Sequence, residues 1–152
     1  MNHIELLKTA GLAKDMTGEE VAALASIAEE QRFARGAEII REDSKSRDLF
    51  VICKGRVSIR LSLPTEVGKE EIIYTMRDGQ IFGELSLVDG SPRSATVRAE
   101  EEVITCQFDF KKLSALLDEK PRIGYLLMRN IASIISARVR NTNMLWRNSL
   151  IW

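Results

Sequence analysis

The sequence predicts a mainly β protein with flanking helices: a β-roll, that is, a jelly-roll-like double-stranded β-helix, with N-terminal helices and a long C-terminal helix. Between residues 32 and 108, short runs rich in β-branched residues are separated by glycines, which is typical of a roll of many short strands. On both sides of that region, apolar residues recur at helical spacing. A chain of 152 residues is long enough to bury a core, so we expect a single domain over residues 1–152.

The N-terminal part, residues 1–31, is expected to be helical. Apolar residues such as Leu7 and Leu24 follow a helical spacing there. Thr17 is followed three residues later by Glu20, a pair that predicts a capping box at the start of a helix.

The middle part, residues 32–108, is expected to form the roll. Val57, Ile59 and Leu61 alternate with Arg56, Ser58 and Arg60, a pattern of a strand with one buried face and one face in solvent. Asp43 stands at an expected turn, and aspartate tolerates a left-handed backbone better than most residues. The expected strands include residues 38–41, 49–53, 56–63 and 70–76, with 64–69 as a hairpin connection.

The C-terminal part, residues 109–152, is expected to be helical again, first over 110–117 and then in a longer helix that begins at Pro121. Proline suits the first helical turn, because its missing amide hydrogen costs little there. One part of the long helix is expected to cover the roll and the rest to pair with a second copy; the alternative is a helix packed only on its own roll. Its apolar stripe comprises Ile123, Leu127, Ile131, Ile134, Ile135, Val139, Leu145 and Trp146.

The charges balance overall, with 22 basic and 22 acidic residues, which provides no general attraction to nucleic acid or to an anionic membrane. Residues 121–152 hold five arginines and no acidic residue, so this helix is the cationic element. Such spread arginines more often face solvent or pair within the fold than contact nucleic acid. We therefore expect no nucleic-acid partner within this chain. Neither a signal peptide nor a membrane span is apparent, so a cytoplasmic location is expected.

Catalytic and metal chemistry find little support in the sequence. Cys53 and Cys106 each stand alone in an apolar run, which predicts buried free thiols in a reducing compartment. The single histidine, His3, cannot form a multi-histidine metal site. No serine-nucleophile motif or Walker loop occurs either. We expect no enzymatic activity, no catalytic residue, no metal and no cofactor.

Residues 82–96, called the cassette below, contain the chemistry of a phosphate and a sugar site. Gly83 lets the backbone approach a ligand closely, and the amides that start a helical turn after it favour an anion. Arg93 offers a planar charged fork for two phosphate oxygens, whereas Glu84 can only accept and therefore suits a sugar hydroxyl. The alternative is a strand, a loop and a second strand with an ordinary surface arginine. The candidate ligand-binding residues here are Phe82, Gly83, Glu84, Leu85, Ser86, Arg93, Ser94 and Ala95.

Phe-Gly-Glu-Leu at 82–85, followed after a short spacer by Arg-Ser-Ala at 93–95, resembles the cyclic nucleotide-binding domain of bacterial cAMP receptor proteins, kinase regulatory subunits and cyclic-nucleotide-gated channels. The likeness covers most of the chain from about residue 20. It implies that Glu84 takes the ribose hydroxyl and Arg93 the phosphate, with Gly83, Ser94 and Ala95 around it. It also implies cAMP as the ligand, with cGMP as the alternative, and a homodimer that forms through the C-terminal helix.

The same resemblance assigns residues on the long helix. Thr142 falls where a helix hydroxyl reaches the adenine, together with Asn143 from a second copy. Arg138, one turn earlier on the same face, either pairs with Glu84 or extends into solvent. Both alternatives for Arg138 stay open at this point.

The leading hypothesis is a cyclic nucleotide-sensing regulatory module in which the ligand changes the position or pairing of the C-terminal helix and so acts on a downstream protein. One alternative is a ligand-free dimerisation or docking module of the same fold. Another is the effector domain of a transcription regulator. Regulators of that kind continue into a helix-turn-helix, and residues 1–152 do not include one. The apolar end at 150–152 is expected to dock on a partner or a second copy.

Overall fold

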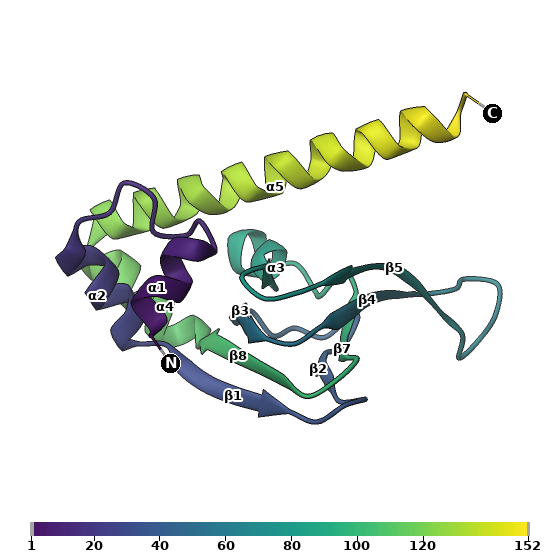
Figure 1. Ribbon diagram of the computed structural model, residues 1–152, viewed down its shortest axis with the longest axis horizontal. Helices are drawn as coiled ribbons and strands as arrows, with labels where there is room; N and C mark the ends of the chain where they lie inside the picture. Colours follow the sequence, from purple (N-terminus) through teal and green to yellow (C-terminus); the bar gives the residue numbers. More distant parts are fainter. Residues whose placement is uncertain (1, 152) are drawn as a thin grey trace.

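The computed structural model describes residues 2–151 as two four-stranded antiparallel sheets that form a β-roll, with helices on one side (Figure 1). One sheet has the order β1-β8-β3-β6 and the other the order β2-β7-β4-β5. The helices are α1 (His3–Thr9), α2 (Gly18–Ser26), α3 (Glu84–Asp89), α4 (Phe110–Glu119) and α5 (Pro121–Ser149). The strands are β1 (Glu29–Phe33), β2 (Glu38–Ile40), β3 (Leu49–Lys54), β4 (Val57–Ser62), β5 (Glu70–Met76), β6 (Ile81–Phe82), β7 (Thr96–Ala99) and β8 (Val103–Phe108). The predicted fold class is confirmed.

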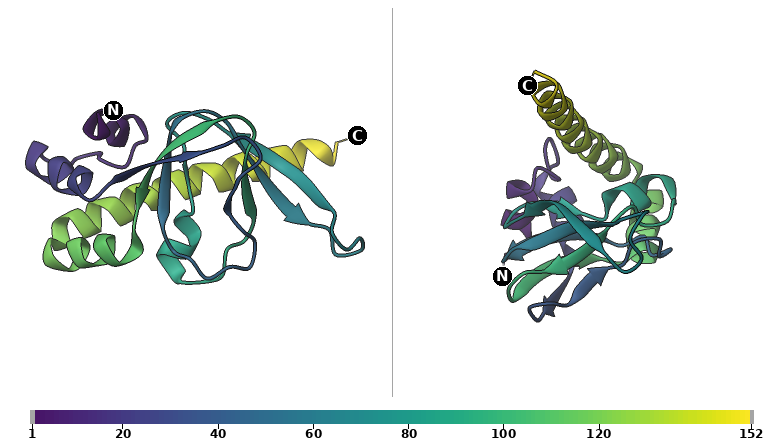
Figure 2. Two further views of the ribbon diagram at one scale, coloured as in Figure 1. Left: turned by 90° about the horizontal axis from the view of Figure 1, so that it is seen from below. Right: turned by 90° about the vertical axis from the view of Figure 1, so that its right-hand side faces the viewer.

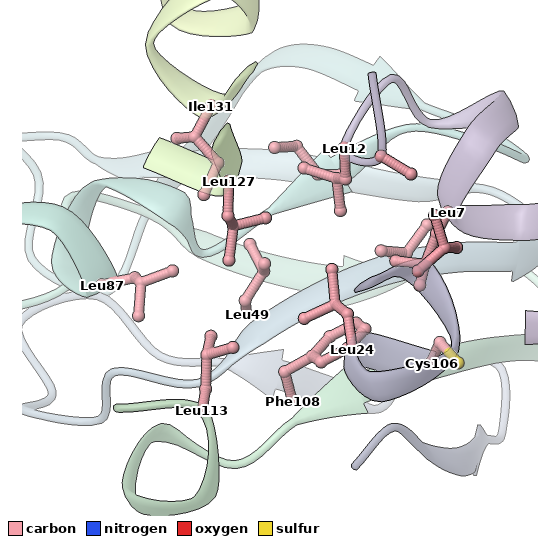
Figure 3. Packing of buried hydrophobic residues seen from close by; sticks show 14 residues of the cluster. Leu7, Leu12, Leu24, Leu49, Leu87, Cys106, Phe108, Leu113, Leu127 and Ile131 are labelled. Carbon is pink, nitrogen blue, oxygen red and sulfur yellow. The ribbon is translucent and has the colours of Figure 1, made fainter. Parts of the chain in front are cut away.

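Strand β3 separates two apolar cores. Leu49 and Val51 point into a cluster that includes residues from every helix, whereas Phe50 and Ile52 point into a second cluster between the two sheets. Successive side chains of a strand face opposite sides, so a strand that is covered on both faces is apolar throughout. Figure 3 shows the first cluster, which we call the helical-side core. Its labelled residues are Leu7, Leu12, Leu24, Leu49, Leu87, Cys106, Phe108, Leu113, Leu127 and Ile131.

The predicted helix starts are confirmed. The Thr17 hydroxyl accepts from the Glu20 amide at 3.2 Å, and the Glu20 carboxylate accepts from the Thr17 amide at 2.8 Å. This reciprocal pair satisfies two amides that the first turn leaves without helical partners. Pro121 occupies the first turn of α5, and Asp43 has the left-handed backbone that its turn requires, with a φ of 66°.

Two local predictions differ from the structure. Strand β1 begins at Glu29, so the change from helix to roll comes three residues before the predicted boundary. Ser58 was expected in solvent but is fully buried. Its hydroxyl donates to Glu100 and accepts from Arg60, and these two residues form an ion pair with 2.9 Å between Nη2 and Oε1. Ser58 can be buried because both capacities of its hydroxyl are used.

Helix α5 is covered by the protein over only its N-terminal half. Its last buried residue is Ile131, and no residue of α5 after it is buried. Ile134 and Ile135 are half-buried, whereas Val139, Leu145 and Trp146 of the predicted stripe are exposed. The right-hand view of Figure 2 shows the C-terminal end of α5 standing away from the roll. None of the helices within residues 2–151 has the length and apolar character needed to cross a membrane.

Candidate functional site

The cassette begins at the end of β6, and Gly83 is the N-cap of α3. Gly83 has a φ of 83°, in the left-handed region that side chains disfavour. A Cβ at this position would lie 2.7 Å from the Asp48 carbonyl oxygen and 2.8 Å from Nη1 of Arg93. The sequence singles out Gly83 because a residue without a side chain lets the backbone approach a ligand closely. Within the protein itself, the backbone already approaches Arg93 and Asp48 so closely that only glycine fits.

Arg93 is a buried cation with neutral partners. Its side chain donates from Nε to the Ser46 hydroxyl at 3.0 Å, from Nη1 to the Gly83 carbonyl at 2.8 Å and from Nη2 to the Asp48 carbonyl at 2.8 Å. Only 3% of the residue is exposed, and it forms no ion pair within residues 2–151. Burial lowers the pKa of the guanidinium, while the charges of Asp48 and Glu84 act in the opposite sense.

These contacts fix the guanidinium and leave part of it free. Three bonds use three of the five N–H groups of arginine, so two donors stay available. A buried charge without a countercharge is costly unless a ligand supplies one. The arrangement around Arg93 therefore suits an anion.

Glu84 follows Gly83 as the first residue of α3, and its side chain pairs with the long helix α5. Its Oε1 accepts from Nη1 of Arg138 at 2.8 Å, and Nη2 of Arg138 donates to the Ile81 carbonyl at 2.6 Å. Only 7% of Glu84 is exposed. Of the two alternatives for Arg138, the structure has the pairing with Glu84. The second carboxylate oxygen, Oε2, accepts no hydrogen bond within residues 2–151.

A cavity of about 350 Å³ is lined by residues of the cassette and by residues of the strands. Its volume lies in the range of small-molecule sites, about 300–1,000 Å³. Polar groups gather on the cassette side, and the strands contribute an apolar wall. The eight predicted residues Phe82, Gly83, Glu84, Leu85, Ser86, Arg93, Ser94 and Ala95 all line it.

Sequence reasoning missed the apolar wall of this cavity. Ile73 and Tyr74, which lie on the edge strand β5, are about half-exposed at the cavity. Partial burial raises the pKa of the Tyr74 phenol, and the charge of Arg138 acts against that rise. The one sequence signal for this wall was the apolar alternation in β4. That pattern predicts that one face of the strand is buried, but not that the face lines a cavity. The other wall residues are Ile40, Ile59, Leu61, Met76 and Val97.

Thr142 does not line this cavity. Its hydroxyl donates to the Arg138 carbonyl of its own helix at 2.9 Å, and the residue is exposed, as is Asn143. A serine or threonine in a helix commonly bonds in this way when nothing else is in reach. A contact between Thr142 and a ligand base therefore requires α5 to approach the cavity, and it stays a prediction.

The two cysteines, which stand apart in the sequence, meet in the structure. Val51 pairs with Cys106 across β3 and β8, and Cys53 follows two residues later at a bulge. Both thiols are free; Cys106 is buried and Cys53 is half-buried. The Cys53 thiol donates to the Val51 carbonyl oxygen at 3.9 Å. The interaction between the two neighbouring thiols lowers the pKa of Cys53 and raises the pKa of Cys106. Within residues 2–151, no three His, Cys, Asp or Glu side chains gather as a metal site.

Comparison with known families gives one match over most of the roll. Residues 30–120 match the model of a family described as the cyclic nucleotide-binding domain. That segment contains the whole cassette, with Glu84 and Arg93, and the strands that form the cavity wall.

Among curated proteins, the chain is 29% identical over 139 residues to the CRP-like cAMP-activated global transcriptional regulator of Mycobacterium tuberculosis. The match covers 91% of this chain and 59% of that protein. The chain is also 28% identical over 100 residues to human cGMP-dependent protein kinase 2, which covers 66% of this chain and 13% of the kinase. The chain thus spans less than two thirds of the length of either relative.

Solved structures agree with the observed fold. A cyclic nucleotide-binding domain from Methylobacillus flagellatus KT has a TM-score of 0.81 and 26% identity, with 90% of this chain and 78% of that chain covered. The N-terminal domain of a transcriptional regulator from Streptomyces coelicolor A3(2) has a TM-score of 0.73 and 28% identity, with 93% and 94% covered.

Proposed function

The chain belongs to the cyclic nucleotide-binding domain family, and on that premise we propose that it is a non-catalytic sensor whose cavity binds cAMP and whose helix α5 responds to the ligand. The observation that carries the proposal is Arg93. Its guanidinium is buried, is fixed by three neutral oxygens and faces a cavity without a countercharge within residues 2–151. A cyclic phosphate has one negative charge and two free oxygens, which match a guanidinium fork.

Glu84 suits the sugar half of the same ligand. One carboxylate oxygen is engaged by Arg138, and the other is free to accept from a ribose 2'-hydroxyl. The separation of a cationic and an anionic group within one cavity favours a ligand with a phosphate on one side and a hydroxyl donor on the other. Inorganic phosphate alone would use only Arg93.

The apolar wall supports a base as the third part of the ligand. Ile73 and Tyr74 lie at the cavity on β5, where a flat heterocycle can pack against them. We favour adenine over guanine, because the relative that matches 91% of this chain is described as cAMP-activated. The kinase match, described as cGMP-dependent, makes cGMP the competing ligand. Thr142 is the candidate base contact when α5 closes.

We further propose that α5 transmits binding through a second copy of the chain. Its exposed apolar residues form no contact with the roll that would bury them, and a homodimer would cover them. In that arrangement Asn143 of one copy approaches the ligand of the other. We also propose a cytoplasmic location, because both cysteines are free thiols, as is usual in a reducing compartment. The exposed apolar residues at this end are Val139, Met144, Leu145, Trp146, Leu150 and Ile151.

Isothermal titration calorimetry with cAMP and with cGMP tests the proposal. We expect cAMP to bind more tightly than cGMP, Arg93→Glu to abolish binding, and Arg93→Lys to weaken it, because an ammonium lacks the fork. Arg35→Glu is the matched control, since Arg35 is exposed and lies outside the cavity lining. It should bind as the wild type does.

Each outcome has a definite meaning. No heat from the wild type with either nucleotide would sink the sensor proposal and favour a docking module of the same fold. Equal binding by Arg93→Glu and the wild type would remove Arg93 from the site.

Sedimentation velocity with and without cAMP tests the homodimer, which a single monomeric species in both samples would contradict. Recovery of intact cAMP after incubation with the protein tests the absence of catalysis.

A further inference from the structure

Arg47 and Asp48, just before β3, contact three functional parts of the molecule. Arg47 contacts α3 and the first residue of α4, and Asp48 contacts Arg93 and that same residue of α4. Neither residue lines the cavity. The pair lies beside the site and connects it to the helices, so its role is distinct from ligand contact.

The Arg47 side chain holds the C-terminal end of the cassette helix. Its Nε donates to the Ser86 carbonyl at 3.0 Å, and its Nη2 donates to the Leu87 carbonyl at 2.9 Å. The Ser86 carbonyl also accepts from the amide of Gly90, the C-cap of α3, at 2.9 Å. Arg47 therefore adds a second donor to Ser86 and supplies one to Leu87, and a cation at the end of a helix also interacts favourably with the helix dipole. Helix α3 has only six residues, and its N-cap Gly83 provides no side-chain bond. So short a helix depends on tertiary contacts for its position.

The same guanidinium packs on α4. The Cζ atom of Arg47 lies 3.9 Å from the centroid of the Phe110 ring, a cation–π contact. The Phe110 amide donates to Oδ1 of Asp48 at 2.8 Å, and Gln107 donates to Oδ2 at 2.6 Å. Phe110 is the first residue of α4 and packs against the helical-side core.

Arg47 has no competing ionic role. It forms no ion pair among the described residues, so its charge faces two helix carbonyls and one aromatic ring. Ser86, whose carbonyl it holds, also lines the cavity. Leu87 of α3 belongs to the same core as Leu113 of α4 and Leu127 of α5, as Figure 3 shows. Arg47 thus connects α3 to α4 through hydrogen bonds and a cation–π contact, in addition to the apolar packing of the two helices in the helical-side core.

We propose that Arg47 is a positioning residue that attaches the end of α3 to Phe110, so that a shift of α3 on ligand binding moves the first turn of α4. This inference rests on the proposed function only in its ligand-dependent part. The attachment itself exists without ligand and can be tested without it. Because Arg47 lies outside the cavity, its loss should affect the helix response more than the affinity.

Hydrogen exchange measured by mass spectrometry, in the wild type and in Arg47→Met, tests the inference. Methionine retains an apolar chain of similar length and removes the charge and both hydrogen bonds. Without ligand, we expect faster exchange in Arg47→Met over residues 84–90 and 108–113 together. With saturating cAMP, we expect the ligand-dependent change over residues 108–119 to be lost, while Kd rises by no more than about tenfold, or about 1.4 kcal/mol.

Two further variants complete the design. Lys45→Met is the matched control, because Lys45 is exposed in the same loop and forms no hydrogen bond or ion pair among residues 2–151. It should behave as the wild type in both measurements. Arg47→Lys keeps the charge but cannot hold two carbonyls with a planar fork, so an intermediate exchange pattern is expected.

The outcomes separate this inference from the proposed function. If Arg47→Met exchanges like the wild type without ligand, or keeps the full ligand-dependent change over 108–119, Arg47 does not position α4. If it loses cAMP binding as completely as Arg93→Glu, it belongs to the binding site instead. If the wild type binds no cyclic nucleotide, the proposed function fails, and the measurement without ligand still decides the attachment.

Discussion

Arg138 of α5 pairs with Glu84 of α3, with 2.8 Å between Nη1 and Oε1. The pair lies beyond Ile131, the last buried residue of α5, and therefore holds a part of the helix that has little apolar cover. Glu84 is also the residue proposed to bind the ribose. Under the proposed function, the ligand and the helix would meet at one carboxylate, and the ligand would then have a direct means of changing the position of α5.

Replacement of Arg138 should loosen the C-terminal half of α5. In Arg138→Met, the nearly buried Glu84 loses its partner, so we expect the free energy of unfolding to fall by about 1–3 kcal/mol. Exchange of amides over residues 134–149 should also be faster. Urea unfolding and hydrogen exchange measure the two effects. Arg140→Met is the control, because Arg140 is exposed and has no ion pair among the described residues; equal effects of the two changes would refute the role of the pair.

Gly83 should tolerate no side chain. Gly83→Ala adds a Cβ that lies 2.7 Å from the Asp48 carbonyl oxygen and forces a left-handed φ on alanine. We expect a loss of about 2–3 kcal/mol in the free energy of unfolding, together with weaker cAMP binding because Arg93 must move.

Gly36 separates the two causes at Gly83. Gly36 has a φ of 88°, but a Cβ there meets nothing within 4 Å. Gly36→Ala should therefore cost only the conformational part, about 1–2 kcal/mol, and leave binding unchanged. If urea unfolding gives the same loss of unfolding free energy for both variants, the close approach at Gly83 does not contribute to the cost of Gly83→Ala.

The two cysteines should differ in reactivity. Cys53 is half-buried and has a lowered pKa because of the neighbouring Cys106 thiol, whereas the pKa of the buried Cys106 is raised. Since the thiolate is the reactive form, iodoacetamide should modify Cys53 first, as peptide mass spectrometry can show. Cys106→Ala removes the neighbouring thiol that lowers the pKa of Cys53, so the pH midpoint of Cys53 alkylation should rise. A midpoint that stays constant or falls would disprove this coupling.

Glu100 should make stability depend on acid pH. Hydrogen bonds from Ser58 and Arg60 hold the pKa of Glu100 below its ordinary value of 4.5. A carboxyl with a lowered pKa in the folded state stabilises fully above its unfolded pKa and loses that effect as the pH falls through the folded value. The unfolding free energy should thus decline below pH 4.5, and less steeply in Glu100→Gln. Glu101→Gln, at an exposed neighbour, should keep the wild-type slope.

The cassette was the part of the site that the sequence could predict. Its residues are consecutive or nearly so, and each has a distinctive chemistry: a glycine, a carboxylate and an arginine at a short interval. The apolar wall could not be predicted in the same way, because Ile73 and Tyr74 are ordinary strand residues. Nothing in their own segment indicates that they border a cavity with Arg93. That relation depends on the pairing of strands far apart in the chain.

Long-range contacts also explain the individual errors. Ser58 follows the alternation of a solvent-facing residue, yet Glu100, more than 40 positions away, accepts its hydrogen bond and permits its burial. Cys53 and Cys106 look isolated because their proximity arises only when β3 and β8 pair. Arg47 carries no motif; its role follows from the packing of α3 and Phe110 around one guanidinium.

Periodicity, caps and charged groups act over a few neighbouring residues, so the amino-acid sequence was enough to predict the succession of helices, roll and long helix, the capping box at Thr17 and the chemistry of the cassette. Three relations became visible only in the folded protein: Arg93 is buried without a countercharge within residues 2–151, Arg138 reaches Glu84, and Arg47 joins α3 to α4. Burial and contact depend on what packs against a residue, and those neighbours come from distant parts of the chain.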